Sequence, residues 1–166
     1  MKFVANASRR IARDKAADWS ILSIVPPRLG FRMKQLHQFD PRQFTDHVRR
    51  HIEATELAGA PAVGSIGFAV QVIKRRFFWR PYLELVVRGS WHPISKVLAK
   101  HYEPTKSTPR PVYVRMLDKA ALLTNAVSNT DPGQAELEDD QWREILALLH
   151  RWQFAGRLIC RNWRVA

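Results

Sequence analysis

The chain has 166 residues, 46% of them hydrophobic, which is enough for one compact domain and leaves little room for a second. A formal net charge of +12 and a pI near 10.7 predict attraction to a polyanion, and nucleic acid is a better candidate than an anionic membrane. No apolar run approaches the roughly 18 residues that cross a bilayer, and the lone Cys160 excludes an internal disulfide and a cysteine-based zinc finger. We therefore expect a cytoplasmic protein.

Residues 1–18 are predicted to form a basic N-terminal arm, followed by a single α+β domain over residues 19–166. Such an arm can lie along a nucleic-acid backbone or enter a minor groove, and we expect it to become ordered only when bound. Its candidate contact residues are Arg9, Arg10, Arg13 and Lys15.

The first elements of the domain have clear boundaries. Residues 19–25 are apolar and β-branched and end at Pro26-Pro27, which predicts a strand. Asp40-Pro41 predicts the start of a helix, because an aspartate accepts from the free N–H groups and a proline fits the first turn. Apolar residues then recur every three to four positions and continue the helix for about four turns.

A β-hairpin is predicted in the middle of the chain. Residues 64–73 alternate between large apolar and small or polar side chains, and residues 82–87 form a second strand of the same kind. The basic run Lys74-Arg75-Arg76 separates them, so we expect the turn of the hairpin there.

The remaining patterns predict a helix over residues 90–102, a strand over 111–116, a short helix over 118–127 and an amphipathic helix over 138–152. From about residue 136 the chain is interpreted as an aromatic-rich helical segment. Its tryptophans are expected in the core or, if exposed, on a surface for self-association or a protein partner. The order β-α-β-β-α-β-α plus a C-terminal helix predicts an α+β fold, with helices on an antiparallel sheet of four to five strands, as in ferredoxin-like layouts.

Two short motifs add to this layout. Trp79-Arg80-Pro81 leads into Tyr82 and Glu84 on the second strand of the hairpin, and Arg110-Pro111-Val112 opens a later strand. Layout and motifs together resemble the catalytic domain of HUH-class replication initiators, the rolling-circle Rep proteins of plasmids and filamentous phages. In that family the positions of Tyr82 and Glu84 are metal-binding histidines, and a nucleophilic tyrosine lies on the helix that matches residues 122–127.

The resemblance implies a shared fold and a lost activity. Cutting a phosphodiester through a tyrosyl intermediate needs a positioned phenol and a metal on the phosphate, and a tyrosine with a glutamate does not replace two imidazoles. We therefore predict a protein that is not an enzyme and has no metal or cofactor. Tyr82 is interpreted as a packed strand residue, and Glu84 as a strand-face carboxylate paired with an arginine, with weak Mg²⁺ binding as the alternative.

The preferred nucleic-acid contact lies at the turn of the hairpin, where cations stand beside aromatic rings and can bind phosphates and unstacked bases. The predicted contact residues are Lys74, Arg75, Arg76, Trp79 and Arg80. The alternative is that the aromatic residues of this stretch pack inward while the basic residues are only solvated.

His47 and His51 have the i, i+4 spacing of helical metal ligands, but no third ligand belongs to the pattern, so a solvated or partly packed pair is preferred. Three classes of function remain. The first, which we favour, is a DNA-binding protein derived from a replication initiator that regulates replication, transfer or transcription without cutting DNA. The second is a partner-binding decoy or inhibitor, and the third is a metal-dependent endonuclease with an unconventional site.

Overall fold

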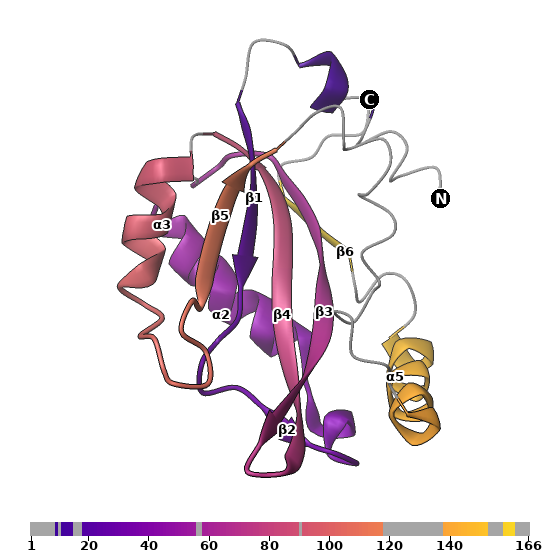
Figure 1. Cartoon of the computed structure of the whole chain (residues 1–166). Helices are drawn as coiled ribbons and strands as arrows, with labels where there is room; N and C mark the ends of the chain where they lie inside the picture. Colours follow the sequence, from indigo (N-terminus) through magenta and orange to yellow (C-terminus); the bar gives the residue numbers. More distant parts are fainter. Residues whose placement is uncertain are drawn as a thin grey trace.

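The structure is a computed structural model of the chain, and it describes residues 9, 11–14, 18–55, 58–89, 91–117, 138–152 and 158–161. Its strands are β1 (Trp19–Ile24), β2 (Phe31–Arg32), β3 (Ala62–Ile73), β4 (Arg76–Arg88), β5 (Val112–Met116) and β6 (Leu158–Arg161). Its helices are the 3-10 turn η1 (Leu36–Gln38) and the α-helices α2 (Pro41–Glu53), α3 (Trp91–Ala99) and α5 (Asp139–Trp152) (Figure 1).

The strands form one antiparallel sheet in the order β5-β1-β4-β3-β6, with β2 paired to the far end of β4. Helix α2 connects β1 to β3 and α3 connects β4 to β5, so each helix joins two strands that have a third strand between them, as in a split β-α-β motif. The predicted α+β fold with an antiparallel sheet is confirmed.

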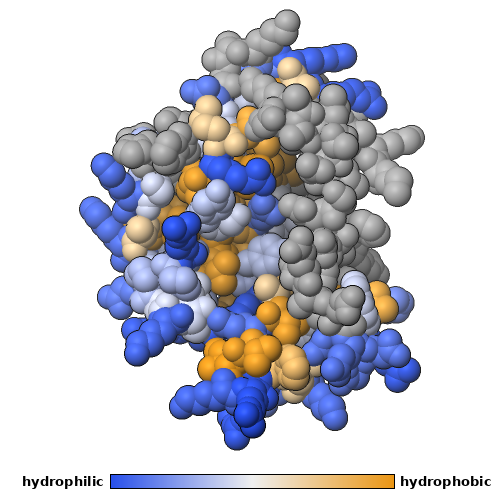
Figure 2. Space-filling view, viewed as in Figure 1, coloured by the Kyte–Doolittle hydropathy of each residue, from blue (hydrophilic) through white to orange (hydrophobic). Residues whose placement is uncertain are grey.

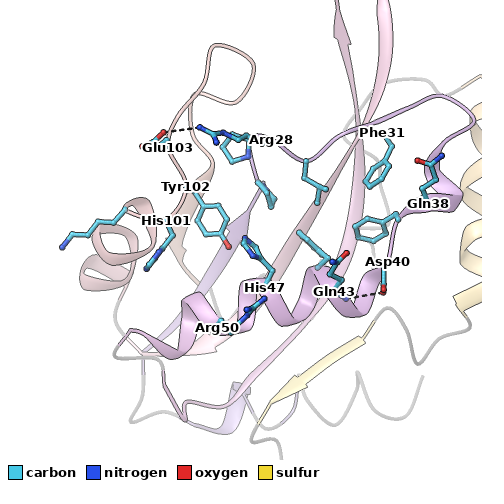
Figure 3. A pocket seen from close by; sticks show the side chains of 16 residues that line it. Arg28, Phe31, Gln38, Asp40, Gln43, His47, Arg50, His101, Tyr102 and Glu103 are labelled. Atoms are coloured by element: carbon cyan, nitrogen blue, oxygen red, sulfur yellow. Dashed lines mark hydrogen bonds and ion pairs between the residues drawn. The ribbon is translucent and has the colours of Figure 1, made fainter.

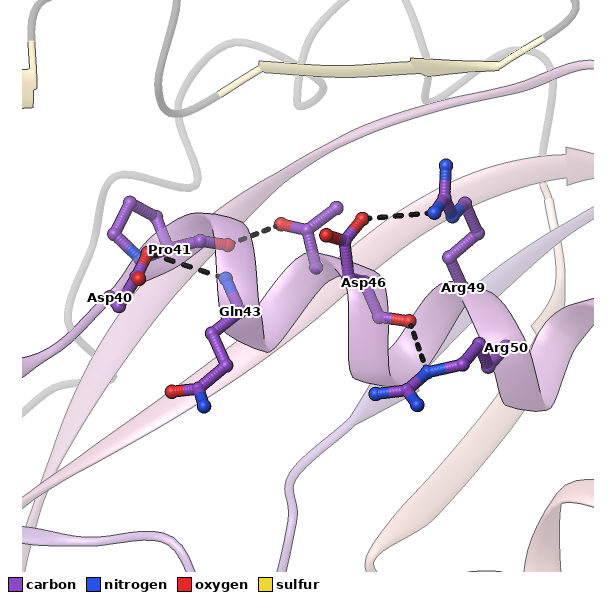
Figure 4. A network of polar contacts seen from close by, with 7 residues as sticks. Asp40, Pro41, Gln43, Asp46, Arg49 and Arg50 are labelled. Atoms are coloured by element: carbon purple, nitrogen blue, oxygen red, sulfur yellow. Dashed lines mark hydrogen bonds and ion pairs between the residues drawn. The ribbon is translucent and has the colours of Figure 1, made fainter.

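Helix α2 begins where the sequence predicts. The Asp40 carboxylate accepts from the backbone N–H groups of Arg42 (2.8 Å) and Gln43 (3.3 Å), and Pro41 occupies the first turn (Figure 4). The apolar face of the helix lies behind the sheet in Figure 1, where Phe44, Val48 and Ile52 are buried in the main core. This packing leaves the opposite face of α2 for polar and charged residues.

Strand β4 is the central strand, and its side chains alternate between the two faces of the sheet. Trp79, Leu83 and Leu85 are buried on the face that α2 covers. Pro81 has no N–H to donate, and on one side of β4 it has no partner strand. On that side, pairing with β1 ends at Leu83 and pairing with β2 starts at Trp79, so Pro81 lies in the gap between them. A proline is therefore tolerated inside a central strand.

The C-terminal part differs from the prediction. Helix α5 confirms the amphipathic helix, but residues 158–161 form the edge strand β6 against β3, where a helical segment was expected. Trp142 is 42% exposed, so the expected core position is wrong for this tryptophan. The predicted helix over residues 118–127 lies outside the described residues. Within the part of the chain that the structure describes, none of the helices is long and apolar enough to span a membrane.

Candidate nucleic-acid interface

The β3–β4 hairpin ends in a two-residue turn made by Lys74 and Arg75. Ile73 pairs with Arg76, and the two turn residues have φ angles of 49° and 62°. Positive φ at both positions is the geometry of a type I′ turn, which normally takes Asn-Gly and costs about 1–2 kcal/mol for each residue of another kind, such as lysine or arginine. Here the strained positions carry two cations, and both are exposed.

The surface beside this turn is apolar. Val72 and Phe77 pair across the hairpin, and their side chains are 60% and 42% exposed. In Figure 2, strongly hydrophilic surface meets apolar surface at the lower end of the molecule, where Figure 1 places the turn. Among the described residues no carboxylate forms an ion pair with Lys74, Arg75 or Arg76. We call Lys74, Arg75, Arg76 and Phe77 the hairpin tip. It combines three cations that have no described carboxylate as a partner with one exposed aromatic ring.

Trp79 was predicted to contact nucleic acid, and the structure corrects this prediction. Its side chain is 0% exposed, and the indole Nε1 donates to the Glu144 carboxylate of α5 at 2.9 Å. Glu144 also accepts from the backbone N–H groups of Lys34 and Leu36, each at 2.9 Å. A base cannot stack on a ring in this position, and Trp79 instead connects the sheet to α5.

Arg80 is also a structural residue, contrary to its predicted role at the interface. The guanidinium Nη1 donates to the carbonyls of Pro27 (3.0 Å) and Leu29 (2.8 Å), and Nε donates to the Gln71 side chain at 2.7 Å. Its Nη2 donates to the Ser107 hydroxyl at 3.3 Å, and burial lowers the pKa of the group. With these donors engaged, Arg80 holds two loops onto the sheet and is not open to a phosphate.

The N-terminal segment is attached to the domain at the residues that the structure describes. Ile11 is 2% exposed and packs with Trp19, and the Asp14 carboxylate pairs with Arg88 at 3.0 Å. These residues pack against the domain without a bound ligand, whereas the arm was expected to become ordered only when bound. Arg9 and Arg13 are exposed and could contact a polyanion, whereas the predicted contacts Arg10 and Lys15 lie outside the described residues.

Tyr82 and Glu84 lie half-buried on the face of the sheet opposite α2. The ring of Tyr82 covers Gly67 on β3 so closely that a Cβ on this glycine would overlap it, which fits the interpretation as a packed strand residue. Glu84 lies level with Ser23 and Ser65 on the neighbouring strands. Within the described ranges no arginine comes within ion-pair distance of Glu84, so its expected pairing stays a prediction, and no group of three His, Cys, Asp or Glu side chains is arranged to hold a metal ion.

A cleft of about 780 Å³ lies on the helix side of the molecule, and the sequence did not predict it. It is bounded by α2, by the connection from β1 to β2 and by the residues that follow α3 (Figure 3). At one end, His47 and Arg50 of α2 face His101 and Tyr102; at the other end, Phe31 lies near Gln38 and Gln43.

A cluster of three histidines adjoins the cationic end of this cleft. The His51 ring stacks on His101 with centroids 4.3 Å apart, contacts His47 edge-on at 4.5 Å, and its Nδ1 lies 2.8 Å from the Tyr102 hydroxyl. Burial, then the nearby His47 and His101, then Arg50 lower the pKa of His51, and burial raises the pKa of Tyr102 well above its ordinary value. A protonated phenol can donate to the Nδ1 of a neutral His51, so the cluster is built for uncharged His51.

The sequence predicted only part of this cluster. The i, i+4 spacing identified His47 and His51 as neighbours, but His101 is 50 positions away from His51 and only the fold brings the two rings together. Comparison of the chain with protein-family models, with curated proteins and with solved structures finds no match.

Proposed function

We propose that the protein binds DNA through the hairpin tip and does not cut it. The observation that carries the proposal is the two-residue turn that holds Lys74 and Arg75 at positive φ beside the exposed ring of Phe77. Strained backbone at an exposed position is a reason to look for a function, since an Asn-Gly turn would close the same hairpin without this cost.

Electrostatics supports a polyanionic ligand. The chain has a net charge of +12, and described carboxylates do not neutralise the cations of the tip. Binding a phosphate to such cations releases condensed counterions from DNA, so the affinity is expected to fall steeply as salt rises. Phe77 adds a ring for contact with an unstacked base, while exposed Arg9 and Arg13 supply further charge on the same chain.

Absence of cutting is part of the proposal for a chemical reason. The positions that match the metal-binding histidines of HUH initiators hold Tyr82 and Glu84, and the ring of Tyr82 is packed over Gly67. A phenol packed on a sheet and one carboxylate lack the ligand set of two imidazoles that polarises a scissile phosphate. A DNA-binding protein of this kind would act by occupying its site, as a regulator of replication, transfer or transcription.

The test is fluorescence anisotropy of labelled duplex, hairpin and single-stranded DNA over a salt series, with the end-point samples run with Mn²⁺ on a denaturing gel. We expect tight binding at low salt, a steep loss of affinity as salt rises, and intact DNA. No binding near physiological salt would remove DNA as the ligand, and cleavage that depends on Mn²⁺ would replace the proposal by a nuclease.

Self-association is a second candidate function, favoured by one surface of α5. Trp142 is 42% exposed and Leu146, one turn later, is 57% exposed, while Ile145 and Leu148 on the inner face are buried. Large apolar side chains one turn apart on an exposed helix face are typical of a contact between proteins. Size-exclusion chromatography with light scattering tests this: a dimer that Trp142→Ala and Leu146→Ala together convert to a monomer supports it, and a monomeric wild type excludes it.

A further inference from the structure

The cleft between α2, the β1–β2 connection and the end of α3 has two chemically different ends. Its volume of about 780 Å³ lies in the ordinary range of sites for small ligands. Figure 3 shows Phe31, Gln38 and Gln43 gathered at one end and His47, Arg50, His101 and Tyr102 at the other. A ligand that fills the cleft therefore contacts an aromatic and amide surface at one end and a cationic surface at the other.

The aromatic end has a rigid floor. The ring of Phe39 is buried and packs edge-on against Phe31 (5.7 Å) and Phe68 (5.3 Å), with Phe44 at 5.5 Å. Phe31 itself is only half-buried, so part of its surface is open to a ligand. The amides of Gln38 and Gln43 are exposed at the rim and offer both donors and acceptors. This combination suits a planar ring with a polar edge.

The cationic end can bind an anion. Arg50 is held by a 3.4 Å bond from its Nε to the backbone oxygen of Asp46, which leaves its terminal nitrogens for a ligand (Figure 4). The two carboxylates on the wall already have partners: Asp40 caps α2, and Glu103 lies 3.8 Å from Arg28. Exposed His47 and His101 add donors beside Arg50.

We propose that this cleft binds a mononucleotide, with the base against Phe31 and the phosphate at Arg50, His47 and His101. Gln43 and Arg50 both project from α2, and the rise between them is about 10 Å at about 1.5 Å per residue. That separation matches the distance from the base to the phosphate end of one nucleotide. The proposal goes beyond DNA binding at the hairpin tip, because none of its residues belongs to the tip.

Binding should strengthen on mild acidification, since protonated imidazoles attract a phosphate more strongly. The charged and titratable groups at this end are His47, His51 and Arg50 from α2, Arg28 from the β1–β2 connection, and Lys100, His101, Tyr102 and Glu103 from the residues after α3. Burial first, and then the charges of His47, His101 and Arg50, lower the pKa of His51, and a bound phosphate would offset the part that comes from these charges.

The test is isothermal titration of the full chain with dAMP at pH 6 and pH 7.5. Arg50→Gln should weaken binding about tenfold or more, because it removes a charge-assisted contact. Arg49→Gln is the matched control: Arg49 is the preceding residue on the same helix, pairs with Asp46 at 3.2 Å, and does not line the cleft (Figure 4). Both variants change an exposed residue, so both are expected to fold.

Ligand fragments test the two ends separately. Deoxyadenosine and inorganic phosphate should each bind at least about tenfold more weakly than dAMP, because each fills one end. The proposal is overturned if no titration heat appears with millimolar dAMP, if deoxyadenosine or phosphate binds as tightly as dAMP, or if Arg49→Gln has the same effect as Arg50→Gln.

A strand end and a free nucleotide share this chemistry, and oligonucleotides distinguish them. If the cleft takes a strand end, a 5′-phosphate tightens oligonucleotide binding in the wild type and not in Arg50→Gln. If it takes a free nucleotide, the 5′-phosphate has no effect and dAMP binds equally well with oligonucleotide present. Replacing Arg75 and Arg76 by alanine should leave dAMP binding unchanged, so failure at the tip and failure at the cleft are told apart.

Discussion

Lys74, Arg75 and Arg76 are exposed at the end of the β3–β4 hairpin, whereas a few residues further along β4 Trp79 is buried and Arg80 is half-buried and held by hydrogen bonds. Both groups place cations beside aromatic rings: the three tip cations precede Phe77, and Arg80 follows Trp79. The tip extends past the last neighbouring strand, while Trp79 is covered by α5 and Arg80 by the loops around Leu29 and Ser107. A basic and aromatic composition therefore predicts an exposed surface only where no other part of the fold contacts the same side chains.

The largest effect is expected when Arg80, a half-buried cation, is removed. Arg80→Ala leaves the carbonyls of Pro27 and Leu29 and the amide of Gln71 without their donor, so the free energy of unfolding should fall by about 3 kcal/mol. Urea unfolding measures this loss. DNA affinity of the folded variant should stay close to that of the wild type; a selective loss of affinity with unchanged stability would place Arg80 in the interface after all.

The partner of Trp79 should show the next largest effect. Glu144→Ala removes the acceptor of the buried indole and of the N–H groups of Lys34 and Leu36, and we expect a loss of about 2 kcal/mol of unfolding free energy. The control is Glu138→Gln, a change at an exposed carboxylate directly before α5 that should stay within about 0.5 kcal/mol. Equal stability of the two variants would contradict the structural role given to Trp79.

The turn itself offers a gain in stability. Replacing Lys74 and Arg75 by Asn and Gly relieves two positive-φ positions and should raise the unfolding free energy by about 1 kcal/mol. The same change removes two cations and should weaken DNA binding. A variant that is more stable and still binds DNA as the wild type does would show that the strained turn is not kept for binding.

The smallest effect is expected from a change of pH, which should alter the stability that depends on His51 but not the DNA affinity of the hairpin tip. The pKa of His51 is lowered in the folded protein, so below its ordinary value near 6.5 the unfolded chain binds more protons, and stability falls as pH falls from 6.5. Thermal unfolding between pH 7.5 and 5 measures this, and His47→Gln should reduce the pH dependence by removing one repelling neighbour. Duplex affinity should change little, since lysine and arginine stay charged in this range.

Elements with local signals were predictable from the sequence. Asp40-Pro41 fixes the start of α2 by capping chemistry, and the alternation in β3 with the basic run after it fixes the hairpin turn. The helix of residues 139–152 follows from its apolar period, but the period does not say which flank meets the core, so the exposure of Trp142 was missed. Strand β6 has four residues and is defined only by pairing with β3.

The candidate sites were predicted less well because long-range contacts decide them. Arg80 donates hydrogen bonds to the carbonyl of Leu29, 51 residues before it, and to the hydroxyl of Ser107, 27 residues after it. The indole of Trp79 donates to Glu144, 65 residues later. No local sequence pattern reveals these distant partners. Lys74, Arg75 and Arg76 have no such partners among the described residues and are exposed, so their predicted contact with nucleic acid is compatible with their position and stays a prediction.

The measurement that tests DNA binding at the tip most directly is the salt dependence of duplex affinity for two variants of equal net charge. One is Arg75→Gln with Arg76→Gln; the other is Arg49→Gln with Arg151→Gln, two exposed arginines on α2 and α5. We predict that the tip variant lowers the slope of log affinity against log salt by about 2 and that the control leaves it unchanged. Equal slopes in both variants would mean that net charge, and not the hairpin tip, attracts DNA.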